Sequence, residues 1–349
     1  MLIDGTIFPT MSLAFSSPLN ALSLLGLGAA GLCAASVASA VAVGSRLGLA
    51  PGWRALFHWA PIAIAVLVAR YMGWADVSIG LIFGTSVAIL SSAVGSLSTV
   101  APVGPAPARW KRIWPFTLAA ALLIFVSGYN GLLTWKHGFT LGVEGLVILS
   151  LWRDPVSEHE WGGAITDPSR PFIPQELAWI AVGVSIFLAG LGAYLAVHGV
   201  QAMTQLKSHA SPGAIAATLL SLVLTTPIMQ SGRGLALAGA SWIPMTAQVG
   251  VVLLNLCLLL PILALLPYAD AIFHAINLGA RPMIDFQSIA PQAMVFPLAV
   301  WRIDSVVLVL LSAILLPAAV GKWNLGKEEG LLLIVGYCLY LLSVTAAGI

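Results

Sequence analysis

The side chains of this sequence that could do chemistry stand close to prolines inside apolar runs. His58 lies three residues before Pro61, and Gln230 lies three residues after Pro227. A histidine in such a run can titrate near neutral pH and line a cavity that admits a solute or a proton. A neutral histidine that bonds a backbone carbonyl freed by the proline would give the same pattern. Both interpretations remain open from the sequence.

More polar side chains follow the same pattern in the second half of the chain. Thr225 and Thr226 are adjacent and directly precede the second proline. Gln248 stands two residues before Gly250, and Asn255 follows in the same apolar run. These hydroxyls and amides could surround a small solute or monovalent ion. They could equally hold neighbouring helices together by hydrogen bonds.

Catalytic and metal-binding patterns are absent from the sequence. It contains no H-E-x-x-H, no G-x-S-x-G and no Gly-rich phosphate loop. Cys33, Cys257 and Cys338 stand singly, without the spacing of a metal or redox site. A net charge of +2 is too small to indicate a nucleic-acid partner. We therefore expect no enzymatic activity, no bound metal and no cofactor.

The composition indicates the environment in which these residues lie. Of 349 residues, 59% are hydrophobic and 8% are charged, where a soluble domain has about 25% charged residues. Apolar runs of about 20 residues are the length of helices that span a lipid bilayer. The sequence therefore predicts an all-α integral membrane protein.

Ten transmembrane helices account for the apolar runs between Pro, Gly and charged residues. A long polar segment separates two sets of five, and an odd number of crossings forces the second set to insert upside down. We expect these helices at 20–45, 52–73, 77–99, 114–134, 140–152, 178–205, 213–232, 240–266, 296–318 and 329–347.

The chain is therefore predicted to have two halves. Residues 1–152 form the first five-helix repeat, and 153–177 form a polar cytoplasmic linker. Residues 178–349 form the second, inverted repeat, with a polar insertion at about 268–295 that could hold a short interfacial helix. Either polar segment could bind a protein partner.

Similar sequence segments in the two halves favour the inverted repeat. The fifth helix opens with LGVEGLVIL from Leu141, and the tenth opens with LGKEEGLLLI from Leu325. Glu144 and Glu329 would then lie in the first turns of these helices, where a negative charge suits the helix N-terminus.

The distribution of Lys and Arg predicts the orientation, because cytoplasmic loops are richer in them. When both termini lie outside, the ten-helix arrangement places ten of them on the cytoplasmic side and five on the other side of a bacterial cytoplasmic (inner) membrane. The inside set is then Arg46, Arg54, Arg109, Lys111, Arg112, Arg153, Arg170, Arg233, Lys322 and Lys327. The outside set is Arg70, Lys136, Lys207, Arg281 and Arg302.

With these features the chain resembles a known family, the cation/calcium antiporter superfamily of sodium/calcium exchanger-like proteins. The LGVEG and LGKEEG openings are similar to the family's fifth and tenth helices. Pro61 and Pro227 match the proline of its GTS-x-PE motif. The resemblance covers most of 20–152 and 178–346, and it implies five-plus-five inverted helices.

A second motif adds to the resemblance. The segment GWADVSIGLIFGTS is similar to the family's acid followed by GN-x-x-GSN, with Gly80 and Gly84 in register. Gly250 and Asn255 match the glycine and the later asparagine in the second half. The resemblance implies that proline and glycine break the helices near the middle of the membrane, so that free carbonyls face a cavity.

The sequence departs from this pattern where the family binds its cation. Ile62 and Ile228 stand where the resemblance implies the ligand glutamates. Without them, six to eight oxygen ligands and a compensating negative charge for Ca²⁺ cannot be assembled. Two functions fit: secondary transport of an ion or small solute other than Ca²⁺, or a transport-inactive scaffold or subunit of a membrane complex. The chemistry favours a proton-coupled, anionic or neutral solute.

Overall fold

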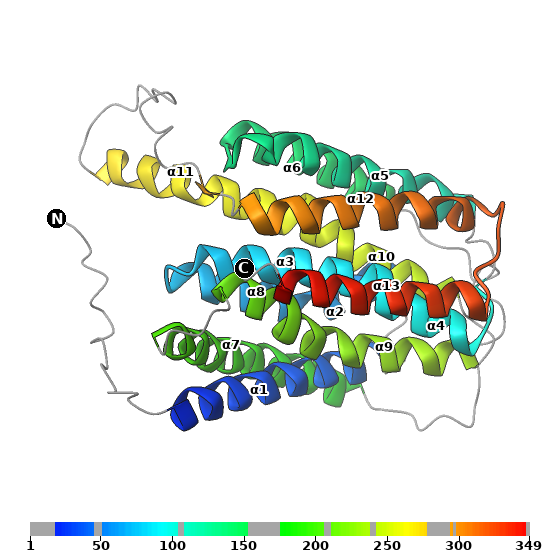
Figure 1. The fold of residues 1–349 in the computed structure, drawn as a ribbon, viewed down its shortest axis with the longest axis horizontal. Coiled ribbons are helices and arrows are strands. Elements are labelled where there is room, and N and C mark those ends of the chain that lie inside the picture. The colour runs from blue at the N-terminus through cyan, green and yellow to red at the C-terminus, as the bar shows by residue number, and fades with distance from the viewer. Residues whose placement is uncertain are drawn as a thin grey trace.

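The protein is a bundle of long helices in the computed structural model, which describes residues 18–44, 51–103, 108–152, 175–205, 211–237, 242–277, 294–295 and 298–346. Ten helical segments form within these ranges (Figure 1). Seven are single α-helices: α1 (Pro18–Gly44), α2 (Pro51–Tyr71), α5 (Ala108–Ser127), α6 (Trp135–Trp152), α7 (Gln175–Gln205), α12 (Leu298–Val320) and α13 (Lys327–Ala346).

Three segments continue through one π-helical turn each. The first is α3 (Ala75–Ala88), η1 (Ile89–Ala93) and α4 (Val94–Val100). The second is α8 (Pro212–Ile215), η5 (Ala216–Leu220) and α9 (Ser221–Leu237). The third is α10 (Trp242–Leu254), η6 (Asn255–Leu259) and α11 (Leu260–Asn277). A short 3₁₀ turn, η2 (Gly128–Asn130), follows α5.

Apolar side chains cover the outside of this bundle. Eight of the segments are long and apolar enough to cross a membrane. Large hydrophobic residues such as Leu19, Phe187 and Leu332 point outward, which is the surface that lipid solvates. The protein is therefore an integral membrane protein. The segments that contain α2 and α6 fall outside the eight, and both carry charged residues.

The segment from α3 to α4 is the centre of the bundle. Its most apolar stretch is completely buried, although it contains many serines and threonines. The hydroxyls of Thr85, Ser86 and Ser92 each donate to the carbonyl four residues earlier, at 2.6 to 2.8 Å. Because their own helix satisfies these groups, a polar sequence can occupy the core without cost in unpaired hydroxyls.

Glycines set the closest helix contacts in the core. A Cβ on Gly84 would lie 2.2 Å from the Ala217 carbonyl oxygen, and one on Gly80 would lie 2.3 Å from that of Gly213. Only glycine permits α3 to approach the second half of the chain this closely. The α1 and α7 helices meet in the same way, since a Cβ on Gly28 would lie 2.3 Å from the backbone nitrogen of Ala196.

The packing partners of the two halves repeat. The α1–α7 and α5–α12 pairs each join helices with the same place in the order of their halves. The α4 contact with α13 has its counterpart in the α11 contact with α6, and α2 packs on α7 as α9 packs on α1. These contacts of the described helices therefore occur in matching pairs when the two halves are exchanged.

A short antiparallel backbone pairing between the two halves lies at each end of the bundle. At one end β1 (Leu132–Leu133) pairs antiparallel with β2 (Met294–Val295). At the other end Val103, which follows α4, forms an antiparallel bridge with Leu325, which precedes α13. Exchanging the halves converts one pairing into the other.

The predicted helix breaks at the prolines are wrong. The α2 helix runs through Pro61, and α9 runs through Pro227. Pro61 has no N–H to offer the Phe57 carbonyl, and the Ser39 hydroxyl on α1 donates to that carbonyl instead. The freed group is thus satisfied by a neighbouring helix rather than facing a cavity.

Two other local expectations are corrected. The α11 helix extends to Asn277, so the first part of the predicted insertion at 268–295 continues a long helix; 278–293 lie outside the described residues. Glu144 is in the third turn of α6, because this helix begins at Trp135, and it does not occupy the first turn as predicted. Glu329 does, and its carboxylate accepts from the Gly326 N–H at 2.9 Å. The segment 153–174 also lies outside the described residues.

Candidate functional site

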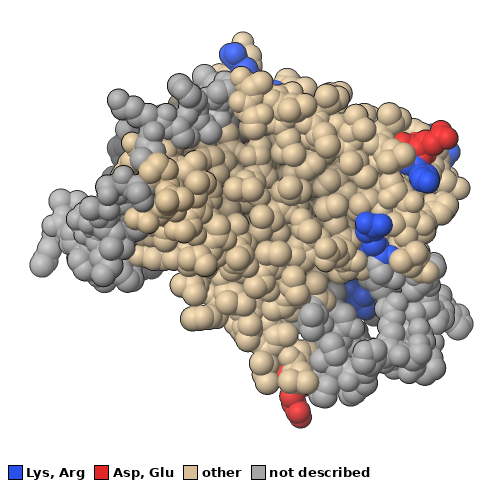
Figure 2. All heavy atoms as spheres, turned by 60° about the horizontal axis from the view of Figure 1, so that its bottom comes forward, with Lys and Arg blue, Asp and Glu red and all other residues tan. Residues whose placement is uncertain are grey.

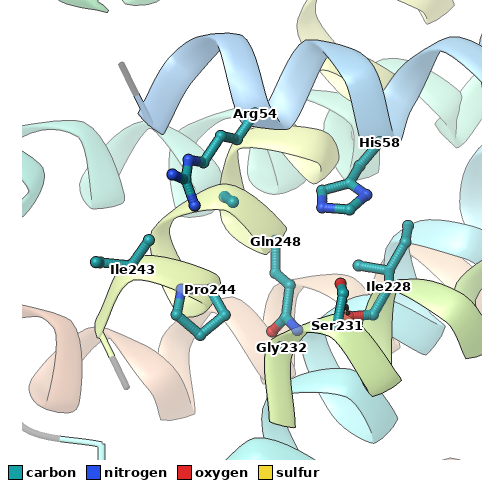
Figure 3. A pocket seen from close by; sticks show the side chains of 9 residues that line it. Arg54, His58, Ile228, Ser231, Gly232, Ile243, Pro244 and Gln248 are labelled. Atoms are coloured by element: carbon teal, nitrogen blue, oxygen red, sulfur yellow. Dashed lines mark hydrogen bonds between the residues drawn. The ribbon is translucent and has the colours of Figure 1, made fainter. Parts of the chain in front are cut away.

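A small pocket lies between α2, α9 and α10, and Figure 3 shows it from close by. Two residues come from α2 in the first half, and all the others come from α9 and α10 in the second half. The lining residues are Arg54, His58, Ile228, Ser231, Gly232, Ile243, Pro244, Ala247 and Gln248.

Polar groups without partners face this pocket. Gln248 is buried, and neither atom of its amide has a hydrogen-bond partner within the described structure. The Nδ1 atom of His58, also buried, lacks one as well in the same residues. A buried amide without partners costs free energy, so the pocket is prepared for a polar occupant.

Two basic residues line the pocket. Arg54 lies one turn before His58 on α2, and both side chains project toward α9 and α10 (Figure 3). No Asp or Glu is among the described residues that line the pocket. A guanidinium can donate several hydrogen bonds to an anionic group.

The size of the pocket limits what it holds in this conformation. It has room for about one or two water molecules. Ile62 and Ile228 are buried in the core, at 0% and 2% exposure. Apolar packing therefore closes the path from the pocket along α2 and α9 toward the middle of the bundle.

Only two of the predicted site residues, His58 and Gln248, line this pocket. Four other predicted site residues are buried but do not line the pocket: Pro61, Thr225, Pro227 and Gly250. The Thr225 hydroxyl donates to the Ser221 carbonyl at 2.9 Å.

Two others face away from the pocket. Thr226 is partly buried, and its hydroxyl donates to the Leu222 carbonyl on its own helix at 2.7 Å. Gln230 is exposed on the surface of α9.

Asn255 belongs to a separate polar contact at the start of η6. Its side-chain nitrogen donates to the Thr85 hydroxyl at 2.9 Å and to the Ser86 hydroxyl at 3.2 Å. This links the central helix of the first half to the equivalent helix of the second half. Gly80 and Gly84 serve the close approach of α3 to the α8–α9 segment described above. These three residues therefore act in helix packing in this structure.

Sequence reasoning missed Ser231 and Asp304 as candidates, and it treated Arg54 only as a marker of orientation. Asp304 is fully buried within α12. It is the only acid between Asp285 and Glu328, which was a usable signal. The helix predicted at 296–318 contains this acid, but Arg302 beside it was used only as a marker of orientation.

The described residues contain no group of three or more His, Cys, Asp or Glu side chains that could hold a metal ion. The glutamates that the family resemblance would place beside Pro61 and Pro227 are isoleucines packed in the core. These two positions therefore present no carboxylate oxygen to a cation in this structure.

Comparison with solved structures identifies the architecture. The sodium–calcium exchanger NCX_Mj aligns over 94% of this chain and 99% of its own, with a TM-score of 0.60 and 15% identity. The H⁺/Ca²⁺ exchanger CAX aligns over 94% of this chain and 85% of its own, with a TM-score of 0.65 and 13% identity. The chain has the sodium/calcium exchanger fold.

The exchanger fold is the extent of this likeness, because identities of this size establish architecture and not activity. No protein-family model matches the chain, and no curated protein matches it. The exchangers that share the fold are transporters rather than enzymes, which is consistent with the absence of a catalytic motif from the sequence.

Proposed function

We propose that this exchanger-fold protein is a secondary transporter of a small anionic or neutral solute other than Ca²⁺, which binds in the pocket of α2, α9 and α10. The observation that carries the proposal is the buried Gln248 amide, unpartnered in the described structure, beside His58 and Arg54. Intramembrane polar groups of this kind are costly to keep and typically serve a solute or ion path.

The position of the pocket supports transport. We infer that residues 1–152 and 178–349 form inverted repeats, because the helix pairs and the end pairings repeat when the halves are exchanged. In transporters built from such repeats, the solute binds where the repeats meet, and one repeat moves against the other around it. The pocket joins α2 of one half to α9 and α10 of the other.

The electrostatics support the choice of solute. Arg54 brings a guanidinium to the pocket lining, which contains no Asp or Glu among the described residues. A small carboxylate or inorganic anion could accept hydrogen bonds from the guanidinium and from the Gln248 amide.

The distribution of charge supports the orientation. Figure 2 shows Lys and Arg side chains gathered toward one end of the molecule, with a broad uncharged surface beside them. By the directions of the helices (Figure 1), the pocket is at this end, where α2 begins and α9 ends. We infer that this end is cytoplasmic and that the chain termini lie outside.

Flux measurements in liposomes test the proposal. We expect the reconstituted protein to take up at least one small anion or neutral solute down an imposed ion or proton gradient. His58→Ala and Gln248→Ala should each lower the rate about tenfold, the effect of losing about 1.4 kcal/mol of hydrogen bonding. Gln230→Ala is the matched control, since this exposed glutamine lies outside the pocket. Equal rates for all four proteins would refute the assignment of the pocket.

One observation favours a second function, that of a scaffold or complex subunit that no longer transports. Ile62 and Ile228 fill the core where the exchanger motifs would have acids. In this case no gradient drives uptake, and purification in mild detergent yields a stoichiometric protein partner that is lost when 153–174 or 278–293 is replaced by a flexible linker.

A further inference from the structure

A second polar site lies apart from the pocket, between α12 and α13. Asp304 is at the seventh position of α12 and is 0% exposed. Neither carboxylate oxygen has a hydrogen-bond partner among the described residues. A carboxyl group held this way inside a membrane-spanning helix is rare and calls for a specific explanation.

Two tyrosines of α13 accompany this carboxyl group. Tyr337 and Tyr340 are 4% and 3% exposed, and their rings stack with centroids 5.9 Å apart. The Tyr340 hydroxyl lies near enough to Asp304 to interact with it electrostatically. Both hydroxyls lack a hydrogen-bond partner in the described structure. Asp304 and Tyr340 are thus buried close together, and Tyr337 stacks on Tyr340.

Cations that could neutralise Asp304 are absent from its described surroundings. Arg302 on the same helix is exposed. Among the elements that pack on α12, α5 carries Lys111 and Arg112 in its first turns, at the opposite end from the start of α12. The acid of α3, Asp76, is exposed in its first turn, as is Tyr129 in η2; η1 has no titratable residue.

Ionisation of Asp304 in this setting would place an uncompensated charge in an apolar interior. That state is far less favourable than the neutral acid, which loses little on burial and can also donate a hydrogen bond. A metal cation would need several more oxygen ligands than one carboxylate and two hydroxyls.

We propose that Asp304 is a proton-binding site, held as the neutral acid in the packing of α12 beside Tyr340 of α13. The proton adds to one carboxylate oxygen and leaves from the same atom. Because Asp304 has no contact with solvent here, release of the proton requires the helix packing around α12 to open. Occupancy by the proton therefore stabilises this closed packing. The site stands independently of the transport proposal.

Infrared spectroscopy of the purified full-length protein tests this directly. At pH 7 the wild-type protein should show the C=O stretching band of a protonated carboxyl group, and Asp304→Asn should lose one carboxyl's share of it. Glu328→Gln, which changes an exposed acid, should retain the full band. Tyr340→Phe should keep the band but shift its frequency, which provides a readout even if Asp304→Asn does not fold.

Two results would overturn the proposal. Identical carboxyl bands in the wild type and Asp304→Asn would show that the group is ionised. Thermal stabilisation by Na⁺ or Li⁺ in the wild type that disappears in Asp304→Asn would assign the site to a metal cation. Neither readout depends on uptake of a solute, so failure of the flux experiment and failure of this proposal are distinguishable.

Discussion

Asn255 links two central helices through its side-chain nitrogen, which donates to the hydroxyls of Thr85 and Ser86. We expect Asn255→Ala to lower the free energy of unfolding by about 1 kcal/mol, the usual value of an interhelical hydrogen bond in a membrane. Thermal unfolding of the purified protein in detergent measures the change.

Thr226→Ala is the control for this variant. Its hydroxyl bonds only to its own helix, at the Leu222 carbonyl, so we expect little change in melting temperature. Equal melting temperatures for Asn255→Ala and the wild type would mean that the amide adds nothing to the packing of the two helices.

The sequence could predict which residues are polar and close to the midpoints of helices, but not which way each one faces. His58 and Gln248 line the pocket, whereas Gln230 is exposed because the rotation of α9 turns Ser231 inward instead. In a helix that is apolar on all sides, hydrophobic periodicity does not fix this rotation. Partners in the other half of the chain fix it, and sequence reasoning does not see them.

At the scale of elements, the α3 contact with the second half depends on the absence of side chains. We expect Gly84→Val to lower the free energy of unfolding by about 3 kcal/mol, because its Cβ would lie 2.2 Å from a backbone oxygen that cannot move away cheaply. The melting temperature and the monodisperse fraction on size-exclusion chromatography measure the loss.

Gly26→Val provides the comparison. A Cβ on Gly26 meets nothing within 4 Å among the described residues, so this variant should behave like the wild type. Similar losses in both variants would attribute the effect to valine in a helix rather than to the crossing of α3.

The positions of the prolines did not predict where these helices depart from α-helical geometry. The helices continue through Pro61 and Pro227, while π-helical turns occur at η1, η5 and η6. A proline removes one hydrogen bond, and a neighbour such as Ser39 can replace it. The π-turns have no residue signature of their own, so packing rather than composition places them.

For the whole molecule, the inferred orientation predicts which helix ends react with a reagent that cannot cross the membrane. Tyr71 is exposed where α2 ends, and Asn324 is exposed between α12 and α13 at the basic end. In a chain with Cys33 and Cys338 replaced by Ser, an impermeant maleimide on intact cells should label Tyr71→Cys. It should label Asn324→Cys only after permeabilisation. The reverse pattern would invert the topology.

The fold was largely predictable because composition and run length are direct consequences of the bilayer as a solvent. The expected all-α membrane architecture is confirmed, and so is its likeness to the exchangers. Helix ends were less predictable: α5 begins six residues before the predicted 114, because Arg109, Lys111 and Arg112 obscured the start. The charged residues lie inside a helix whose first turn reaches the membrane surface.

The α2 helix, with its two arginines and a histidine, is not among the eight segments long and apolar enough to cross a membrane. During synthesis it would leave the translocon before α10, which covers its polar side. Until the second half is translated, no helix covers the side chains of His58 and Arg54. The free energy that α2 gains by inserting into lipid alone is therefore small. Biogenesis of this protein therefore depends on late helices retaining an early one. A nascent chain cut between the halves would leave α2 on the membrane surface rather than across it.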